Sequence, residues 1–397
     1  MNTARIYLYP KKEESILRFH PWVFSGAIAS IEGKPEEGDL VEVFGADRSS
    51  FLGIGHYQIG SIAVRILSFK PVLIDHAFWT ERLRNAYELR RSLGLTKAEG
   101  HDTYRLVHGE GDQLPGLIID IYGAMAVVQA HSVGIHHARF AIAQALREVT
   151  DDAFQAIYYK SEGTLPFKAA LGNENEFLYG HRPDGELIAS EKGLQFHVDW
   201  LKGQKTGFFI DQRENRMLLE RYAHGRSVLN MFCYTGGFSV YAMRGGAATV
   251  HSVDSSAKAI ALTEKNIRMN FPEDLRHQTF TADAFDFLDR TSDRYDLIVL
   301  DPPAFAKHKN VLRNALQGYR KLNAAAIAKI RSGGILFTFS CSQVVSKNDF
   351  RLTVFSAAAQ SGRHVRILHQ LTQPADHPVN IYHPEGEYLK GLVLWVE

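Results

Sequence analysis

The second half of the chain alternates regularly between two patterns of hydrophobic and polar positions. From about residue 226, near-continuous apolar runs are separated by segments in which apolar residues recur at the spacing of a helix face. Such runs are typical of parallel strands that helices cover on both faces. This part of the sequence therefore predicts an α/β fold with a Rossmann-like sheet. The predicted strands are 227–232, 248–254, the beginning of 279–288, 295–301 and 334–341, and the predicted helices lie at 236–246, 255–270 and roughly 311–331.

The first half has shorter runs in which apolar and polar residues alternate. Residues 1–72 show such runs between Gly-rich breaks, which predicts a small β-barrel. Residues 75–95 have helical periodicity, and residues 116–130 predict two strands around a Tyr-Gly turn. The section after the barrel is therefore predicted to be α+β. Together the patterns predict three domains, at 1–72, 73–185 and 186–397.

Composition restricts the class of protein. Hydrophobic residues make up 45% and charged residues 22% of the 397 residues, as in a soluble globular protein. No apolar run approaches the roughly 20 residues of a membrane helix, and the N-terminus lacks the apolar core of a signal peptide. Two cysteines cannot form a disulfide framework, and the 18 histidines show no metal-type spacing. We therefore expect a cytoplasmic protein with no membrane segment and no metal site.

One long stretch of the chain carries charge of a single sign. The net charge is only +1, yet residues 302–348 contain no acidic residue. Such a stretch is typical of a surface that follows nucleic-acid phosphates, although a helix face paired with acids from elsewhere would explain it equally well. Its basic residues are Lys307, Lys309, Arg313, Arg320, Lys321, Lys329, Arg331 and Lys347.

The residues after the first three predicted strands suit an adenosine ligand. In this architecture ligands bind beyond the C-terminal strand ends. Gly236 and Gly237 let a backbone approach a ligand at a helix N-terminus, although the pattern is not the GxGxxG of dinucleotide sites. Asp254 ends the next strand, where an acid accepts ribose hydroxyls, and Asp283 follows the third strand, within reach of an adenine amino group. Each residue alone would also serve as a helix cap.

The fourth and fifth predicted strands end in residues that could carry chemistry. DPPAFAK (301–307) places two prolines directly after Asp301, which makes a stiff extended turn. FTFSCSQ (337–343) places Cys341 between two serines at the tip of a strand. A cysteine there is either a small packed thiol or a reactive group, and the residues around the strand tip decide between them.

These motifs, taken in order, resemble those of a known enzyme family. NMFCYTGGFS (230–239), SVD (252–254), ADAFDFL (282–288), DPPAFAK and FTFSCS are similar to the S-adenosylmethionine (SAM) methyltransferase motifs of the bacterial 23S rRNA cytosine-C5 methyltransferases, the RlmI family. GQKTGFFIDQRENR (203–216) resembles the family's entry segment, and the N-terminal KKEESILRFHPWVFSGAI resembles its RNA-binding PUA domain. The likeness covers essentially the whole chain. It implies SAM as cofactor and 23S rRNA as substrate.

The resemblance also implies a mechanism and a set of site residues. Cys341 would add to C6 of an unstacked cytosine, which makes C5 nucleophilic, and Asp301 would hold or protonate N3. We hypothesise that Lys205, Asp211 and Arg213 of the entry segment help close the site. The predicted SAM-binding residues are Asn230, Phe232, Tyr234, Thr235, Gly236, Asp254, Asp283 and Asp301 with Lys205 and Asp211, and the predicted RNA-binding residues are Pro302, Pro303, Phe305 and Arg213.

The sequence departs in two places from the wider group of RNA cytosine-C5 enzymes. Many carry a second cysteine after the prolines of the fourth-strand motif, where this chain has Ala304 and Phe305, so product release needs another base. Asn230 replaces the usual acid of the first SAM motif. RlmI-type sequences share both departures. Cys233, in the glycine loop, is interpreted as a small packed thiol.

Other functions remain open from the sequence. DPPAF also resembles the [DN]PP[YF] motif of amino-group methyltransferases, and relatives of this domain methylate guanine in 23S rRNA. Against that reading, Ala304 separates the prolines from Phe305, and amino-group methylation leaves Cys341 idle. A non-catalytic RNA-binding assembly factor and a small-molecule methyltransferase are further alternatives. The sequence also leaves a homodimer open.

Overall fold

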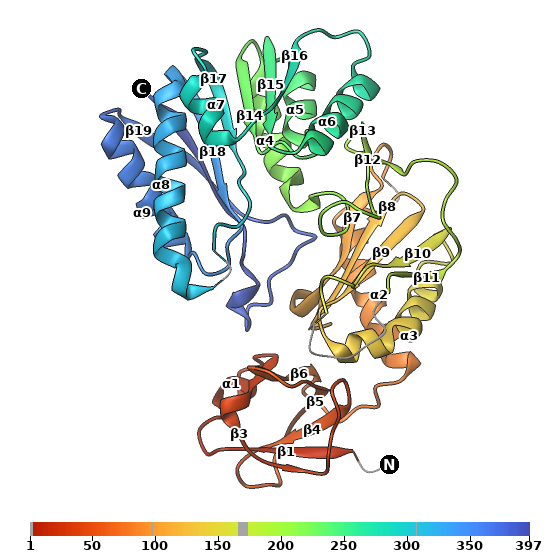
Figure 1. Ribbon diagram of the computed structural model, residues 1–397. Coiled ribbons are helices and arrows are strands. Elements are labelled where there is room, and N and C mark those ends of the chain that lie inside the picture. The colour runs from red at the N-terminus through yellow and green to blue at the C-terminus, as the bar shows by residue number, and fades with distance from the viewer. Residues whose placement is uncertain (1–2, 97, 166–173, 307) are drawn as a thin grey trace. The chain divides into compact units, whose positions relative to one another are not determined.

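The computed structural model describes residues 3–96, 98–165, 174–306 and 308–397, so Lys307 of the basic stretch lies outside the described residues. The chain forms two compact units (Figure 1). The first contains Met1–Lys192, Val198–Ile210 and Ala375–Gly386, and the second contains Gly193–His197, Asp211–Pro374 and Glu387–Glu397. The finer division into three domains stays a prediction.

The first unit begins with a six-stranded sheet of order β2-β6-β5-β4-β1-β3. Alternating burial along β4, where Val41 and Val43 are fully buried, shows one face turned to a core. The short strands predicted for this region are therefore confirmed. They are β1 (Ala4–Leu8), β2 (Trp22–Phe24), β3 (Ile28–Glu32), β4 (Leu40–Phe44), β5 (Phe51–Tyr57) and β6 (Ile62–Ser68), and α1 (Glu14–Leu17) lies between β1 and β2.

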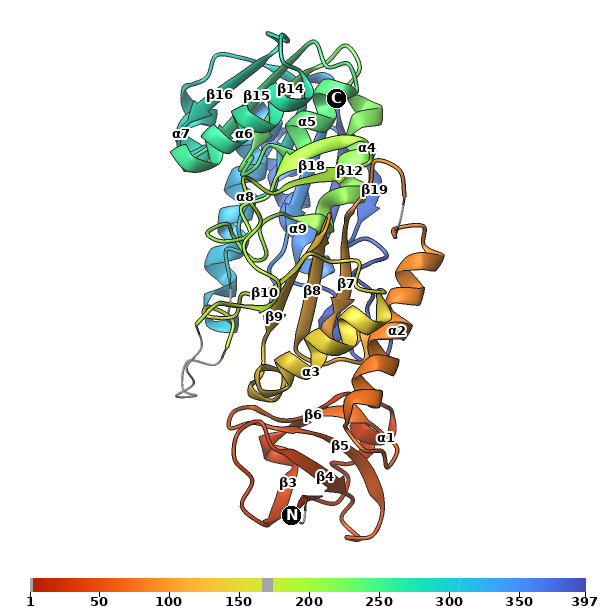
Figure 2. The ribbon, with the colours of Figure 1, turned by 90° about the vertical axis from the view of Figure 1, so that its right-hand side faces the viewer.

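A second sheet of the first unit has the order β11-β10-β9-β8-β7. Two helices, α2 (His76–Ser92) and α3 (Val133–Val149), pack against each other and against this sheet (Figure 2). Asp75 and Ser132 cap them by accepting the N–H of Phe78 and of Ile135. The helix predicted at 75–95 and the two strands predicted at 116–130 are confirmed. The strands are β7 (Thr103–His108), β8 (Leu117–Tyr122), β9 (Met125–Ala130), β10 (Ala156–Tyr159) and β11 (Glu176–Tyr179), and β12 (Ile188–Glu191) and β13 (Leu194–His197) form a separate two-stranded sheet.

The first unit should lose stability in mild acid because of His56. Burial, reinforced by the positive charges of His137 and Arg65, lowers the pKa of His56 to about 4. An unfolded histidine has a pKa of about 6.5, so between pH 6.5 and 4 the unfolded chain binds the extra proton and stability falls as the pH falls. We expect His56→Gln to remove up to about 3 kcal/mol of this acid dependence. Urea unfolding at pH 7 and pH 4.5 measures it. The exposed His364→Gln variant should retain the full dependence.

The second unit is built on a seven-stranded sheet of order β16-β15-β14-β17-β18-β20-β19. All neighbouring pairs are parallel except those that involve β20, which runs antiparallel to β18 and β19. The strand order reverses between β14 and β17, which is where ligands bind in doubly wound sheets. The strands are β14 (Ser227–Met231), β15 (Thr249–Asp254), β16 (His277–Thr281), β17 (Tyr295–Leu300), β18 (Ile330–Ser340), β19 (Val365–Leu371) and β20 (Lys390–Val396).

Two groups of helices cover this sheet, one on each face. Leu229 and Met231 of β14 belong to the core that α8 completes, whereas Asn230 between them bonds Ser239 of α5. The predicted strands and helices from residue 226 to 341 are confirmed, but β19 and β20 were not predicted. The first group is α4 (Arg213–Ala223), α5 (Gly237–Arg244) and α6 (Ala257–Asn270), and the second is α7 (Ala284–Arg290), α8 (Leu312–Lys329) and α9 (Lys347–Ser361).

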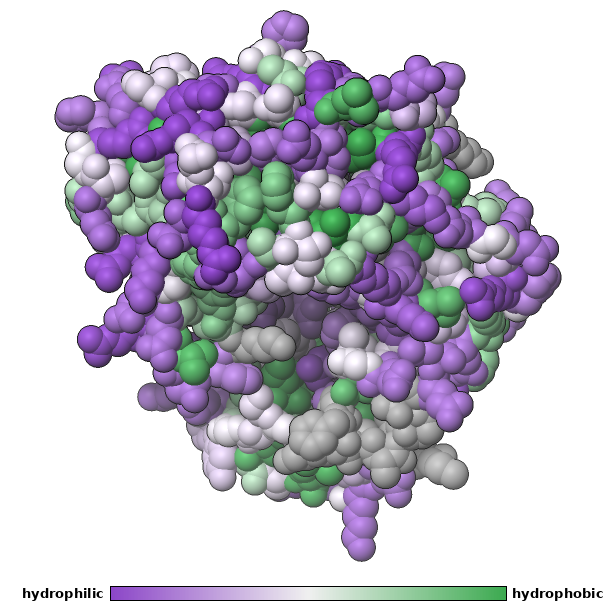
Figure 3. All heavy atoms as spheres, turned by 45° about the horizontal axis from the view of Figure 1, so that its top comes forward, coloured by the Kyte–Doolittle hydropathy of each residue, from purple (hydrophilic) through white to green (hydrophobic). Residues whose placement is uncertain are grey.

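The surface carries the polar character that the composition indicated. Hydrophilic side chains cover most of the face drawn in Figure 3, with apolar side chains gathered in smaller patches. Among the described residues, no helix has the length and the apolar character that crossing a membrane requires.

Candidate active site

The loop that follows β14 is conformationally strained. Phe232, Tyr234 and Gly236 have φ angles of 59°, 46° and 75°, and the residues between them do not share this left-handed conformation. Residues other than glycine pay about 1–2 kcal/mol in that region, so the surrounding structure must hold Phe232 and Tyr234 in place. Alternating conformations of this kind turn successive N–H groups toward a concave site that suits an anion.

Hydrogen bonds from β15 and α6 hold this loop. Asp254 accepts the Tyr234 N–H at 3.0 Å through Oδ2, and Oδ1 accepts the N–H of Ser256 at 2.9 Å. On the α6 side, Thr263 donates to the Tyr234 carbonyl at 2.9 Å, and Asn266 donates to the Thr235 carbonyl at 2.8 Å. Asp254 therefore lies directly against the loop, as the spacing of the motifs predicted.

Asn230 places an unsatisfied acceptor beneath the same loop. Its Nδ2 donates to Ser239 at 2.9 Å, whereas its buried Oδ1 accepts no hydrogen bond from the described residues. A buried acceptor without a donor costs about 1–3 kcal/mol, so a donor group on a bound ligand would be favoured here. The strained loop, the Asp254 carboxylate and this orphaned oxygen fit a polar ligand such as the amino-acid end and ribose of SAM.

Gly236→Ala should disturb this loop through a steric clash as well as through its left-handed backbone conformation. A Cβ at residue 236 would lie 2.6 Å from Cγ2 of Thr263, at a φ of +75°. We expect SAM affinity to fall at least about tenfold, since both strain and clash displace the loop. Calorimetric titration with SAM measures the loss. Gly225→Ala is the matched control, because Gly225 has a φ of +68° with nothing within 4 Å, and it should bind SAM normally.

Asp283 has the helix-capping role that the sequence left open. Its Oδ1 accepts the N–H groups of Phe285 at 2.8 Å and of Asp286 at 3.2 Å, which starts α7. Both bonds use one oxygen, so Oδ2 can still accept from an adenine amino group. A pocket of about 490 Å³ adjoins Asp283 and extends along α7. It lies beside the predicted adenine end of the site and not at Cys341.

Cys341 is the accessible residue of the Ser-Cys-Ser sequence. Ser340 and Ser342 are at most 1% exposed, whereas Cys341 is partly exposed at the C-terminal end of β18. Ser340 donates to the Tyr319 hydroxyl of α8 at 3.0 Å, and Ser342 lies 3.4 Å from the same hydroxyl. The two serines therefore anchor the strand tip in the core, and the thiol between them is not sealed inside it.

Asp301 directly follows β17, the strand beside β18, and its carboxylate is held by a hydrogen bond. Gln212 donates to Oδ2 of Asp301 at 3.0 Å and itself accepts from Asn215 at 2.6 Å. The proline turn that follows is tied to the thiol strand, because the N–H of Ala306 donates to Ser342 Oγ at 3.3 Å. The structure therefore brings Asp301 and Cys341 to adjacent strand ends, as their positions in the sequence predicted.

The predicted RNA-contacting residues lie on that same turn. Pro302 is buried and Pro303 is exposed. The half-buried Phe305 packs against the Tyr319 ring, with 4.5 Å between ring centres. One face of Phe305 is therefore occupied, and a base could stack only on the other.

The entry segment is divided between the two units. Asp211 and Arg213 belong to the second unit and are buried, and Asp211 accepts a hydrogen bond of 2.7 Å from the Tyr388 hydroxyl. Arg213 contacts Glu214 at 3.3 Å. Lys205 belongs to the first unit, where its Nζ lies 4.9 Å from the centre of the Phe209 ring. The other predicted site residues all belong to the second unit.

Lys390 is a site residue that the sequence analysis missed. Its Nζ donates to the carbonyl oxygen of Ser342 at 2.6 Å, and the residue is only 6% exposed. Burial lowers the pKa of Lys390 to about 8, against the opposing effect of the Cys341 negative charge. No local motif marks Lys390, because its position depends on the pairing of β20 with β18. Gln212 and Tyr319 were also missed, because their contacts with Asp301 and with the two serines depend on the packing of α4 and of α8.

The second cysteine is a packed thiol, as predicted. Cys233 is 5% exposed and contacts the Thr263 hydroxyl at 3.5 Å. Burial raises the pKa of Cys233 to about 12, so it stays protonated at neutral pH.

The basic stretch divides between the two interpretations that the sequence left open. Lys329 donates to the Thr291 carbonyl, Arg331 pairs with Asp296, and Lys347 pairs with Glu387, so these cations are paired with groups from elsewhere. The remaining cations of the described part of the stretch are exposed and form no ion pair with another described residue. They are Lys309, Arg313, Arg320 and Lys321, of which Arg313 and Arg320 line a groove that α9 also lines.

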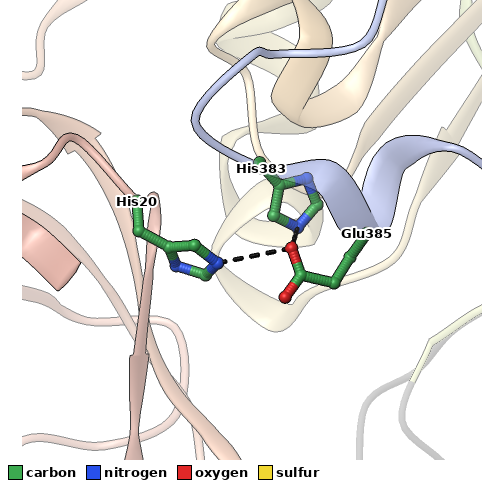
Figure 4. A group of neighbouring side chains, drawn as sticks. All are labelled: His20, His383 and Glu385. Carbon is green, nitrogen blue, oxygen red and sulfur yellow. Dashed lines mark hydrogen bonds and ion pairs between the residues drawn. The ribbon is translucent and has the colours of Figure 1, made fainter.

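Three side chains of the first unit meet, one from the segment just before β2 and two from a short segment near the C-terminus. His20 and His383 both point at the Glu385 carboxylate, with N–O separations of 3.4 and 3.7 Å (Figure 4). Charge-assisted hydrogen bonds are shorter, at about 2.7–2.9 Å, so this is a loose cluster. His383 and Glu385 are two residues apart, but His20 is distant in the chain, so a search for local metal motifs could not find the group of three.

Comparisons with known proteins identify the family. Residues 105–385 match the family described as S-adenosylmethionine-dependent methyltransferase, and residues 6–69 match a PUA-like domain. The ribosomal RNA large subunit methyltransferase I of Aeromonas hydrophila is 40% identical and that of Escherichia coli O1:K1 is 38% identical, over 99% and 98% of both chains.

Two solved structures share the fold of the whole chain. A Streptococcus mutans protein named as a SAM-dependent methyltransferase has a TM-score of 0.84 at 23% identity, covering 99% of this chain and 100% of its own. SMU.776, a methyltransferase by name and solved with S-adenosylhomocysteine, has a TM-score of 0.85 at 24% identity, covering 100% of both chains. The chain described above thus belongs to the SAM-dependent methyltransferases, in the family of the ribosomal RNA large subunit methyltransferases I, and carries a PUA-like domain near its N-terminus.

Proposed function

We propose that this SAM-dependent enzyme forms 5-methylcytosine in 23S rRNA through a covalent adduct between Cys341 and C6 of the target base. One observation carries the proposal: the partly exposed Cys341 lies between two buried serines at the strand end next to the one that presents Asp301. The names of the relatives support an RNA of the large ribosomal subunit as the substrate. The cytosine and its C5 atom rest on the resemblance of the motifs and on the chemistry of the thiol.

We assign the cofactor site to the strained loop after β14 and the carboxylate of Asp254. Bound SAM supplies an electrophilic methyl group on a sulfonium sulfur. In this assignment Asp254 accepts hydroxyl hydrogens of the ribose while it keeps its bond to the Tyr234 N–H. Oδ1 of Asn230 accepts a donor of the ligand, which satisfies the oxygen that the protein leaves unpaired.

The thiol is assigned the work of activating the base. C5 of cytosine is a weak nucleophile, and addition of the Cys341 thiolate to C6 gives it enamine character. C5 would then bond to the methyl carbon as the bond from that carbon to the sulfonium sulfur breaks and S-adenosylhomocysteine leaves. A base takes the proton from C5, and the C6–S bond breaks to return its electron pair to the sulfur of Cys341. The base must be unstacked for this attack, and we assign Phe305, which is half-buried on the proline turn, to stack on it.

Asp301 is assigned to N3 of the same base. Addition at C6 moves negative charge onto N3, which a protonated or hydrogen-bonded carboxyl group stabilises. Gln212 donates to Oδ2 of Asp301, which helps to keep the side chain in one orientation at the end of the strand. Rigid placement of this kind suits a group that acts in only one step.

RNA binding is assigned to two surfaces of the chain. The exposed cations Arg313 and Arg320 of α8 line a groove and would pair with phosphates, and the PUA-like domain supplies the second contact region.

The test is a methyl-transfer assay that identifies the product nucleoside. The protein is incubated with SAM and 23S rRNA from a strain that lacks it, and the digested RNA is analysed by mass spectrometry. We expect one equivalent of 5-methylcytidine. A methylated guanosine would support the amino-group reading, and absence of methylation with SAM still bound would support a binding factor; either result would overturn the proposal.

A further inference from the structure

Lys390 is a buried amine that lies beside the thiol and has no role in the reaction described so far. It pairs in register with Ser340, the residue before Cys341. Opposed residues of antiparallel strands project to the same face with their Cβ atoms about 5 Å apart. The Lys390 side chain therefore starts next to the residue that precedes the thiol.

The other end of the same side chain reaches the residue after the thiol. Nζ of Lys390 donates to the Ser342 carbonyl at 2.6 Å. The Lys390 side chain thus bridges the residues on either side of Cys341. An ammonium has three N–H groups and this bond uses one, so two remain for other acceptors.

The charges around Lys390 favour an ion pair with a thiolate. The titratable groups that act on it are the Cys341 thiol, Glu387 and Lys347, and the attraction of Cys341 is larger than the contributions of the other two. The nearby Tyr319 hydroxyl stays neutral, because burial raises its pKa. Although burial lowers the pKa of Lys390 to about 8, the amine remains mostly protonated at neutral pH.

We propose that Lys390 is a positioning residue that holds Cys341 as a thiolate through an ion pair. The thiol gives its proton to water and keeps the electron pair that later forms the bond to C6. The ammonium supplies the positive charge that stabilises this anion. The pair is lost when sulfur becomes neutral in the adduct and is regained when the C6–S bond breaks, so Lys390 also favours product release. This role rests on the proposed function of Cys341 as the nucleophile.

The test measures the reactivity of the thiol itself, without RNA. The full chain is alkylated with iodoacetamide between pH 5.5 and 9.5, and modification of Cys341 is followed by peptide mass spectrometry. The buried Cys233 should stay unmodified. Lys390→Met removes the charge and keeps a side chain of similar length. We expect the midpoint of its pH–rate profile to rise by at least about one unit, so alkylation at pH 7 slows about tenfold.

Matched variants separate charge from packing. Lys390→Arg keeps the charge and should keep a midpoint closer to that of the unchanged protein. Lys390→Gln removes the charge but can still donate to the Ser342 carbonyl, and it should behave like the methionine variant. SAM binding shows whether each variant is folded. If Lys390→Met does not fold, Lys390→Gln replaces it in the test. Lys347→Met removes an exposed neighbouring charge and should shift the midpoint by less than about a third of a unit.

The outcomes distinguish this inference from the proposed function. An unchanged midpoint in both neutral variants of Lys390 would overturn the ion pair, even if 5-methylcytidine is formed. A raised midpoint in both would support the ion pair, even if the product nucleoside were a different one. In the latter case the thiolate would exist but would serve another reaction.

Discussion

Replacement of Cys341 by alanine should abolish methyl transfer to RNA while SAM binding persists. The thiol is the group that activates the base in the proposed mechanism, and alanine offers no atom that could add to C6. The cofactor loop contacts Asp254, Thr263 and Asn266 and does not depend on Cys341, so the SAM affinity should change less than about twofold. Methyl incorporation into 23S rRNA and calorimetric SAM titration measure the two properties separately.

Cys233→Ala is the control for this experiment. It removes the other thiol of the chain, which is buried and whose pKa is raised to about 12. Methylation should persist, and the free energy of unfolding should fall by about 1 kcal/mol. Full activity of the Cys341→Ala variant would contradict covalent catalysis and would favour methylation of an exocyclic amino group.

Asp301→Asn should slow methyl transfer by about 10²–10⁴-fold, the range that a positioned acid supplies. Asparagine preserves the shape of the side chain, and its carbonyl oxygen can still accept the hydrogen bond from Gln212. The variant should therefore fold normally but lose the carboxyl group that protonates or stabilises N3 of the base. Single-turnover rates at saturating SAM and RNA isolate the chemical step from binding.

Asp296→Asn is the matched control. Asp296 is a carboxylate of β17 that bonds Ser227 and Arg331, and it lies near the opposite end of the strand from Asp301. It should lower stability and leave the single-turnover rate within about twofold. If Asp301→Asn weakens SAM binding but leaves the single-turnover rate at saturating SAM unchanged, Asp301 would instead act on the cofactor alone.

The sheet of the second unit could be predicted from the sequence as far as β18 because buried parallel strands are continuous apolar runs. The last two strands escaped prediction for a physical reason. β19 has three exposed positions in succession, so it shows neither a continuous buried run nor a regular alternation. Its partner β20 lies beyond residues 375–386, which belong to the other unit. Nothing local indicates that residues on either side of that segment pair with each other.

The candidate site was predictable where its residues directly follow strands. Asp254, Asp301 and Cys341 were found in this way, because parallel strands place their carboxyl ends at one edge. Lys390 and Gln212 were not, since their partners Ser342 and Asp301 lie 48 and 89 residues away in the chain. Such pairs depend on antiparallel register and on the packing of α4, which composition and spacing do not encode.

The central claim is that sulfur of Cys341 bonds to the base during turnover. RNA that carries 5-fluorocytidine tests it most directly. Release of the adduct requires loss of a proton from C5, and fluorine in place of that hydrogen cannot be removed by a base, so the adduct is trapped. With SAM present we predict a protein–RNA complex whose cross-linked peptide contains Cys341, and no complex from the Cys341→Ala variant. Methyl transfer to the fluorinated RNA without any covalent complex, or a cross-link at another residue, would contradict the account.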